Sequence, residues 1–413
     1  GAEARAVEGL LLAEQDKAPD DIILRDLLAD FYVHTGEWQE ALLQSRSLDR
    51  LLAEGGERLL RLGQSLQANG QFALAEKAFS YVLTDHGAGG PQGLTALLER
   101  ARTLELQARA QQPPDSLALR RAAEAYAALA EEHPGGTHAA RARLARAQIL
   151  AFSLGAPEAA LAELAAVDGP RLPAALRAEA RLATGDVQLA LGQPARARLA
   201  YSRVEAEMGD AQEGAAAKFR LARLAYFLGD FEAAKARLLT LKDNAQDDIA
   251  NDAIRLYLTI FDNLTIDDST GATLRAFAQA QRLLYERQPG PAERLLDSLL
   301  AAAPQHALAD DILYEKAQLA LARRQPQQAL ALLAQLLAGN LWLWGMTRYK
   351  HNLGRAEAYF QAAAHHPYAM IEETTRGKVG LHYVRQMPRI AFILGNRLVP
   401  FLWPDAFYLR VVP

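Results

Sequence analysis

The residue types that could do covalent chemistry occur throughout this sequence, but they are not spaced for it. No Gly-x-Ser-x-Gly, His-Glu-x-x-His, phosphate-loop or dinucleotide-binding pattern occurs in the 413 residues. Carboxylates mostly stand beside arginines, as in LLERARTLE, an arrangement typical of solvated helix faces. We therefore expect no catalytic residues and predict that the chain is not an enzyme.

The nine histidines are scattered and form no metal-binding pattern. His365 and His366 are adjacent, so on a helix they would point about 100° apart and could not hold one ion from one face. His133 and His138 flank Pro134 and a glycine pair, a loop placement that surface polarity explains better. Since the chain also has no cysteine, thiolate sites and disulfides are excluded. We predict no metal and no cofactor.

Two segments have the composition of ion-binding loops. Residues 85–93, DHGAGGPQG, are glycine-rich, but no strand precedes them and no Gly-Lys-Ser/Thr follows, so phosphate binding is not expected. In TIDDSTGA, Asp267, Asp268 and Ser269 lack the alternating oxygen ligands and the distal Glu of a calcium loop. Helix capping is the simpler interpretation of these three residues.

The elements that carry these side chains repeat along the chain. Gly36 and Gly70 lie 34 residues apart, and Ala29 and Gly63 precede them at the same offset. Small residues let two helices cross closely, and large apolar residues fill the space between them. The spacing predicts an array of helix pairs, an all-α solenoid, in place of one closed core.

Further copies of the pattern follow along the chain, the first two stronger than the rest. They carry Gly185, Gly192, Ala197 and Tyr201; Ala222, Gly229, Phe231, Ala234 and Leu238; Ala122, Tyr126 and Pro134; Gly155, Ala160 and Leu164; Ala280, Ala292, Leu296 and Pro304; and Ala317, Ala329 and Leu333.

At these positions the sequence resembles the tetratricopeptide repeat family, whose pattern combines a Leu-Gly pair, a Tyr, an Ala, a Phe and a closing Pro. The resemblance covers roughly nine tenths of the chain. It implies an α-solenoid of antiparallel helix pairs wound into a right-handed superhelix. It also implies a binding role, without saying what is bound.

We expect residues 1–367 to form this solenoid. Residues 248–263 predict an extra amphipathic helix that breaks the alternation of first and second helices. From residue 368 the sequence is aromatic, β-branched and interrupted by proline, and it lacks the polar outer face of a capping repeat. Residues 368–413 are predicted to form an atypical C-terminal segment, either a cap or a docking tail.

Composition narrows the choice of partner. A net charge of −4 and a pI near 6.2 give no basic face for phosphates, so nucleic acid is not expected. No stretch reaches the roughly 18 to 20 apolar residues that span a bilayer, so we predict no membrane-spanning segment. The chain begins at Gly1 inside what reads as the last helix of an earlier repeat. We expect it to be a piece of a longer protein, and a lipid anchor through the missing N-terminus stays open.

The resemblance also implies which side chains face a partner. In the family, the first helix of each repeat turns fixed positions toward an inner groove, and in the first two repeats these are Asp26, Asp30, Leu60 and Gln64. Later repeats give the candidate partner-binding residues: Phe219, Arg223, Tyr226, Phe277, Gln281, Tyr314 and Gln318.

Aromatic residues beside Arg or Gln are usual anchors of peptide recognition. The alternative is that Phe219, Phe277 and Tyr314 pack between repeats. Asp26 and Asp30 stand where the family's clamp for a peptide carboxylate needs Lys and Asn. A receptor of that type is therefore not expected.

These observations predict a non-enzymatic scaffold or adaptor that binds other proteins in a larger bacterial assembly. Only eight of the 45 basic residues are lysine, which indicates a GC-rich bacterial genome. Residues 215–264 and 306–321 resemble long repeat proteins of the Bacteroidota and their relatives, many of them envelope lipoproteins or periplasmic proteins. That resemblance implies a periplasmic or outer-membrane-associated location. The alternative is a cytoplasmic regulatory sensor whose groove binds a signalling peptide.

Overall fold

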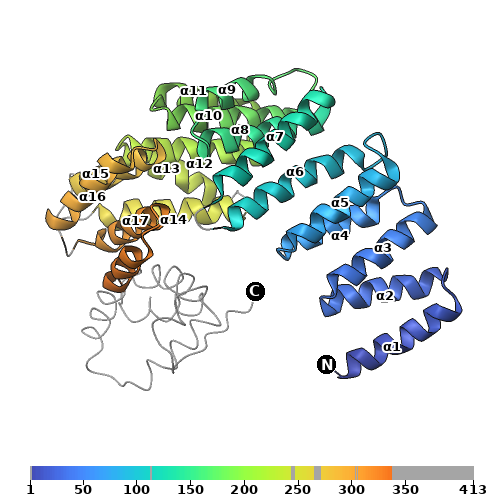
Figure 1. Ribbon diagram of the computed structural model, residues 1–413. Helices are drawn as coiled ribbons and strands as arrows, with labels where there is room; N and C mark the ends of the chain where they lie inside the picture. The colour runs from blue at the N-terminus through green and yellow to red at the C-terminus, as the bar shows by residue number, and fades with distance from the viewer. Residues whose placement is uncertain are drawn as a thin grey trace. The chain divides into compact units, whose positions relative to one another are not determined.

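The structure, a computed structural model, describes residues 2–111, 114–242, 247–264, 271–302, 304 and 306–336. Within these residues every regular element is a helix (Figure 1). Consecutive helices pack against each other in opposite directions in residues 2–208 and again in residues 272–322. The prediction of an all-α solenoid built from antiparallel helix pairs is confirmed.

The helices and their bounds are α1 (Ala2–Lys17), α2 (Ile22–Thr35), α3 (Trp38–Leu52), α4 (Glu57–Ala68), α5 (Phe72–His86), α6 (Gly93–Ala110), α7 (Ser116–Glu132), α8 (Gly136–Phe152), α9 (Pro157–Ala165), α10 (Ala174–Ala190), α11 (Pro194–Met208), α12 (Gln212–Phe227), α13 (Phe231–Lys242), α14 (Asp247–Asn263), α15 (Ala272–Tyr285), α16 (Pro289–Ala302) and α17 (Ala309–Ala322), followed by helical residues 326–336.

Polar caps start several of these helices. Oδ1 of Asp21 accepts hydrogen bonds from the backbone N–H groups of Ile23 and Leu24, at 2.9 and 3.1 Å, at the start of α2. Asp115 caps α7 in the same way. These bonds satisfy N–H groups that have no partner inside the helix, and they fix where each helix begins.

The turn inside a helix pair uses left-handed backbone. The glycines at this position have φ of 79° (Gly36), 71° (Gly70), 69° (Gly192) and 78° (Gly229). In the units of Ala280 and Ala317 the same turn is made by Arg287 and Arg324, each with φ of 60°. A side chain makes this conformation less favourable than it is for glycine. The turn persists without its glycine, which explains why these two repeats are weak in the sequence.

The two helices of a pair cross where a glycine meets an aromatic ring. A Cβ added at Gly63 of α4 would lie 2.5 Å from Cε1 of Phe79 in α5. Gly185 of α10 faces Tyr201 of α11 at least as closely, and Phe79 and Tyr201 are fully buried. The predicted alignment of small and large residues therefore places helix against helix as expected.

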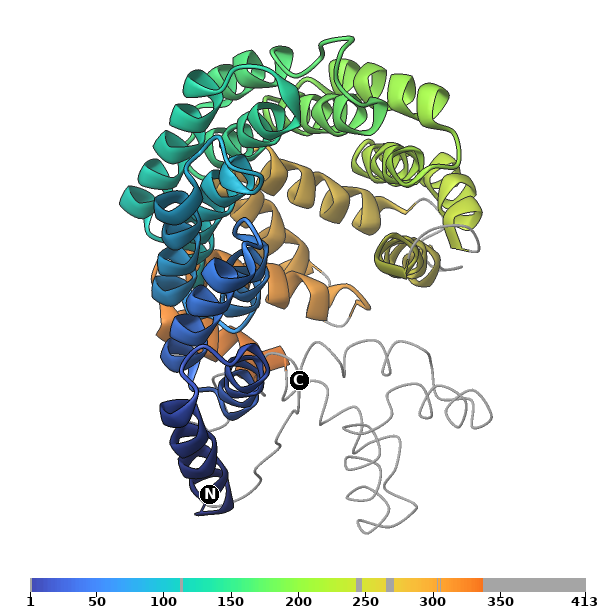
Figure 2. The ribbon, with the colours of Figure 1, turned by 90° about the vertical axis from the view of Figure 1, so that its right-hand side faces the viewer.

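Successive pairs stack so that like helices contact like helices. The first helices α4, α6, α8 and α10 contact one another in turn, and the second helices α3 and α5 also contact each other. Figure 2 shows these helices side by side along the array. Two helical layers result, and each repeat packs on its neighbours alone.

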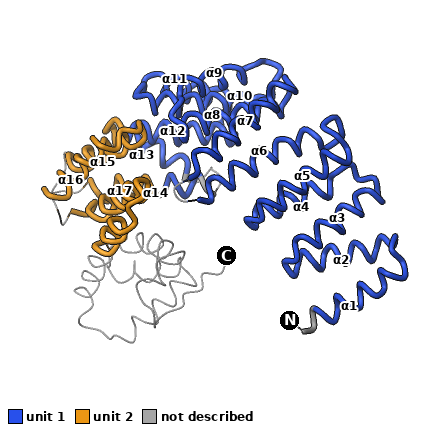
Figure 3. The backbone as a smooth tube through the Cα atoms, in the orientation of Figure 1, with its two compact units in different colours: residues 1–226, 232–254 blue, residues 227–231, 255–413 orange. Residues whose placement is uncertain are grey.

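The chain divides into two compact units (Figure 3). The first consists of Gly1–Tyr226 with Glu232–Ile254, and the second of Phe227–Phe231 with the chain from Arg255 onward. The division falls within α14, the helix that occupies the residues where an extra helix is predicted. The predicted boundary at residue 367 and the segment 368–413 lie outside the described residues.

Ion pairs reinforce the contact between repeats in the first unit. Asp85 of α5 accepts two hydrogen bonds from Arg46 of α3, both at 2.8 Å, and two from Arg50, at 3.1 and 2.6 Å. The Asp85 side chain is only 6% exposed. Arg46 above all, and then Arg50, hold the pKa of this carboxyl well below its usual range.

Gly63→Ala should lower the free energy of unfolding by on the order of 1 to 3 kcal/mol, because the added Cβ collides with the Phe79 ring. The loss should occur although alanine favours a helix by about 1 kcal/mol over glycine. Gly9→Ala in α1 is the matched control, since a Cβ there meets nothing within 4 Å. Urea unfolding followed by circular dichroism measures both. An unchanged midpoint for Gly63→Ala would show that α4 and α5 do not cross at this glycine.

Asp85→Asn should lower the free energy of unfolding by about 2 kcal/mol near neutral pH, because it removes charge-assisted hydrogen bonds from two arginines. The folded pKa of Asp85 is lowered, so its contribution is complete above the unfolded value near 4 and is lost as the pH falls below it. The difference in unfolding free energy between parent and variant should therefore begin to narrow near about pH 5 and continue to narrow as the pH falls toward the lowered folded pKa. Asp20→Asn, an exposed site, is the control; a gap that does not change with pH contradicts the assignment.

Candidate protein-interaction surface

Two rows of side chains run along the first helices at fixed distances from the turns. The polar row lies six residues before each turn residue and consists of Asp30, Gln64, Asp186 and Arg223 in the first unit and Gln281 and Gln318 in the second. The mixed row lies ten residues before it and consists of Asp26, Leu60, Leu182 and Phe219 in the first unit and Phe277 and Tyr314 in the second. The rows of the two units are described separately.

Every member of the polar row reaches solvent. Asp30, Gln64 and Gln318 are exposed, and the other three members are half-buried. The position is polar and reaches solvent in these six repeats. In the first unit the row is interrupted between Gln64 and Asp186, since Ile149, six residues before the left-handed Gly155, is fully buried. Such a row is suited to contact an extended partner.

Some residues of the mixed row are buried in the hydrophobic core, and others reach the surface. Leu60 and Phe277 are 8% and 1% exposed, whereas Phe219 and Tyr314 are half-buried. The expectation that Phe277 is open to a partner is therefore wrong, and packing between helices is its role. Phe219 and Tyr314 retain surface beside the polar row, as the candidate-site hypothesis requires.

The structure also corrects the prediction that Tyr226 contacts a partner. Its side chain is 1% exposed and belongs to the largest fully buried side chains of the described residues. It cannot be reached by a partner while the repeat is folded. Large rings fill the space that alanines and glycines leave between helices, and this packing demand takes Tyr226 out of the predicted surface.

The polar row also connects neighbouring first helices. Gln64 donates from Nε2 to Oε1 of Glu99 in α6 at 3.4 Å. In the second unit Gln281 of α15 donates to Oε1 of Glu315 in α17 at 2.8 Å. The same side chains thus hold successive repeats together and lie at the surface.

In the first unit, several polar side chains meet at one member of the polar row, Asp186 of α10. Its carboxylate accepts a hydrogen bond from the Tyr201 hydroxyl at 2.8 Å. Arg220 of α12 approaches it through Nε at 3.0 and 3.1 Å, and Arg223 through Nη2 at 3.4 Å. One carboxylate thus joins a hydroxyl and two guanidinium groups. Positioned polar groups beside the half-buried Phe219 are suited to contact a peptide.

Asp186 is absent from the candidates drawn from the sequence, although a signal for it exists. It lies six residues before Gly192, and Arg223 lies six residues before Gly229. Applying the same offset to the Gly192 repeat finds it. The offset alone does not show that Arg220 also turns toward this carboxylate.

A second electrostatic feature lies near the start of α10. Burial raises the pKa of Glu179, repulsion by Glu213 of α12 adds to the shift, and Arg141 of α8 opposes it. Carboxylates of α10 and α12 therefore stand close together on the first-helix layer. A cationic group of a partner placed between them would relieve the repulsion.

His138, expected in a loop, packs between two helices. His138 lies within α8, not in a loop, and its Nε2 is 3.1 Å from the Thr95 hydroxyl of α6. Burial first, and then Arg141, lower the pKa of His138 and favour the neutral ring. His365, His366, Asp267, Asp268 and Ser269 lie outside the described residues.

The described residues contain no group of three or more His, Cys, Asp or Glu side chains that could hold a metal ion. The glycine-rich residues 85–93 form a tight turn, in which a Cβ at Gly93 would collide with the backbone of Ala88. This collision explains a glycine there without any phosphate.

Among the described helices, none combines the length and the apolar character needed to cross a bilayer.

Helix pairs at spacings of 34 to 37 residues, crossing at a small residue and turning through left-handed backbone, define the architecture. The chain has a tetratricopeptide-type fold. No protein-family model and no curated protein sequence matches the chain. The comparison with known proteins therefore consists of solved structures.

Solved structures to which this chain is similar include the following three. A tetratricopeptide repeat protein from Parabacteroides merdae has a TM-score of 0.37 and 13% identity, over 69% of this chain and 93% of that one. PilW, a type IV pilus biogenesis factor, has a TM-score of 0.36 and 16% identity, over 60% and 94%. A Rap protein complexed with Competence and Sporulation Factor has a TM-score of 0.37 and 16% identity, over 81% and 94%.

Asp186→Ala should loosen the contact between α10, α11 and α12, because it leaves the Tyr201 hydroxyl and two guanidinium groups without their shared acceptor. Removing one partner of such a cluster costs about 2 to 3 kcal/mol. Hydrogen exchange read by mass spectrometry should show faster exchange in peptides from these helices. Peptides from α2 to α5 are the internal control, since repeats contact only neighbours. Exchange that stays unchanged in α10 to α12 would mean that Asp186 does not join these helices.

Proposed function

We propose that the protein is a non-enzymatic scaffold that binds other proteins through the first-helix surface of its array. The observation that carries this proposal is the polar row, with the half-buried Phe219 and Tyr314 beside it. A solenoid presents one stripe of side chains per repeat along an extended face. That geometry favours contact with a long segment of a partner over reaction at one point.

The candidate partner contacts in the first unit are Phe219 and Arg223. Asp186, which also binds Arg220, accepts a hydrogen bond from Arg223. An aromatic ring next to a guanidinium group that is already positioned is a frequent anchor of protein interfaces. Gln281, Tyr314 and Gln318 are the corresponding contacts in the second unit.

The setting we propose is a larger assembly of the bacterial cell envelope, in the periplasm or at the outer membrane. Support comes from the resemblance of residues 215–264 and 306–321 to long envelope repeat proteins. In this proposal residues 368–413 form a cap or a docking tail. The alternative is a cytoplasmic sensor whose groove binds a signalling peptide.

The gene sequence upstream of Gly1 separates the two settings. A signal peptide followed by a lipobox cysteine supports the envelope scaffold. A DNA-binding or catalytic domain at that place overturns it and leaves the sensor.

A peptide-display selection against the protein, followed by affinity measurement, tests the surface itself. Peptides selected on the parent should bind the double variant Phe219→Ala, Arg223→Ala at least about tenfold more weakly, which corresponds to about 1.4 kcal/mol. The matched control is Leu117→Ala, Arg120→Ala on α7, which removes the same kinds of side chain from an exposed site in the other layer. Equal losses in the two variants, or no loss in either, would falsify the first-helix surface as the contact.

A further inference from the structure

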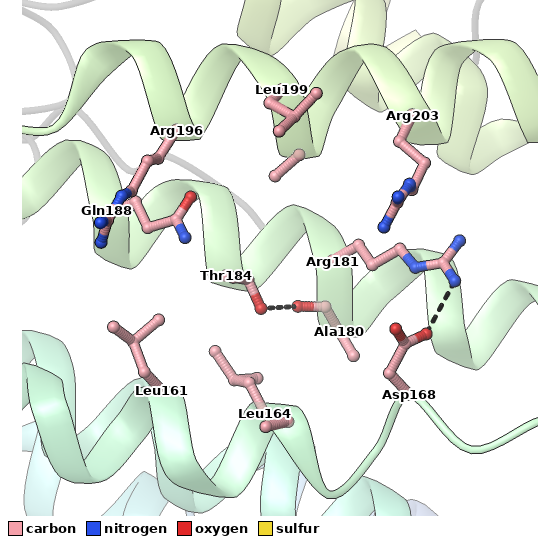
Figure 4. Close-up of a pocket in the computed structure, with 12 residues that line it drawn as sticks. Leu161, Leu164, Asp168, Ala180, Arg181, Thr184, Gln188, Arg196, Leu199 and Arg203 are labelled. Carbon is pink, nitrogen blue, oxygen red and sulfur yellow. Dashed lines mark hydrogen bonds and ion pairs between the residues drawn. The ribbon is translucent and has the colours of Figure 1, made fainter.

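The first unit contains a cavity of about 450 Å³ between α9, α10 and α11, on a face of α10 different from the one that carries Asp186. Figure 4 shows Leu161 and Leu164 of α9 facing Leu199 of α11 across it. Arg196 lies at one end and Arg203 at the other. Small side chains of α9, α10 and α11 leave the rest of the wall open.

The cavity results from an unequal pair of second helices. α3 and α5 are both fifteen residues long and contact each other, whereas α9 has nine residues beside the fifteen of α11. The short α9 leaves part of α10 and α11 without the cover that a full-length second helix would give. Leu199 is accordingly 69% exposed, although it faces apolar neighbours.

The rim is positively charged. Among the lining residues, three arginines stand against one carboxylate, Asp168. Asp168 is already paired with Arg181 at 2.8 Å, and Glu207 pairs with Arg181 as well. Arg181 is therefore paired with two carboxylates, and together with Arg196 and Arg203 these five groups carry a net charge of +1.

Two other carboxylates of α9 and α11 are engaged elsewhere, whereas Glu158, at the start of α9, is exposed. Glu163 pairs with Arg143 and Arg146, and Glu205 pairs with Arg237. Arg196 has one hydrogen bond, to the neutral amide of Gln193 at 3.0 Å. Arg196 and Arg203 thus have no ion pair within the described part of the chain, and both are exposed.

The spacing of the two arginines defines what they can hold. They lie seven residues apart on α11, two turns of the helix or about 10 Å, with Leu199 between them. On a partner helix lying alongside, carboxylates seven residues apart face the two arginines while apolar side chains between them enter the cavity. An apolar anchor flanked by charges complementary to the rim gives both affinity and register.

We propose that this cavity is a second binding site, which takes an acidic amphipathic helix of a partner protein and is independent of the first-helix surface. The apolar side chains of that helix occupy the space between Leu161, Leu164 and Leu199. Its carboxylates bind Arg196 and Arg203. The partner helix completes the layer that α9 leaves short.

The probe is an alanine- and glutamine-based helical peptide with leucines on one face, flanked by glutamates seven residues apart. Fluorescence anisotropy should show that this peptide binds the parent chain and that its affinity falls as the salt concentration is raised. A peptide with glutamine in place of the glutamates, or with alanine in place of the leucines, should bind at least about tenfold more weakly. Arg196→Gln with Arg203→Gln should lower the affinity for the parent peptide by a similar factor. Arg198→Gln, on the same helix but not lining the cavity, is the matched control.

Two further variants keep the test decisive. Ala200→Phe fills the cavity without changing charge and should abolish binding while circular dichroism remains that of the parent. Phe219→Ala with Arg223→Ala should leave binding intact, so failure of the first-helix surface and failure of this site are distinguishable. The proposal is overturned if the peptide does not bind, if Arg198→Gln weakens binding as much as the double arginine variant, or if a fatty acid such as laurate binds where the peptide does not.

Discussion

The close crossing of two helices at a glycine is the constraint on which this structure depends. A Cβ at Gly63 or Gly185 would enter the ring of Phe79 or Tyr201, so the two helices of a pair are as near as their backbones allow. Because each pair presents the same packed face to the next pair, the distance between successive pairs is also repeated. The two layers of helices, and the rows of side chains along them, follow from that repetition.

Ion pairs also join neighbouring repeats, at positions that are partly open to solvent. Asp85 between Arg46 and Arg50, and Asp186 between Arg220 and Arg223, join helices from neighbouring repeats. Carboxylates held by two guanidinium groups are costly to leave alone, so each one couples its repeats. Among the described residues, Arg196 and Arg203 have no such carboxylate partner, and we propose that a ligand provides one.

The two proposed binding surfaces arise in different ways in this array. The polar row is a product of repetition, since one offset from the turn is polar in six of the repeats. The cavity beside α9 is a product of departure from repetition, since one short helix uncovers Leu199 and its neighbours. Regular repeats suit an extended partner, and an interrupted repeat suits a single inserted helix.

The sequence by itself determined the helix pairs, their register and the residues at their crossings, because small and large side chains recur at the period of the repeat. It also named five of the six polar-row residues, Asp30, Gln64, Arg223, Gln281 and Gln318, but not Asp186. Only the tertiary structure decided that Tyr226 and Phe277 are buried while Phe219 and Tyr314 reach the surface. It also decided which arginines have carboxylate partners. Burial and pairing depend on helices that stand side by side in space but tens of residues apart in sequence, so a local pattern cannot fix them.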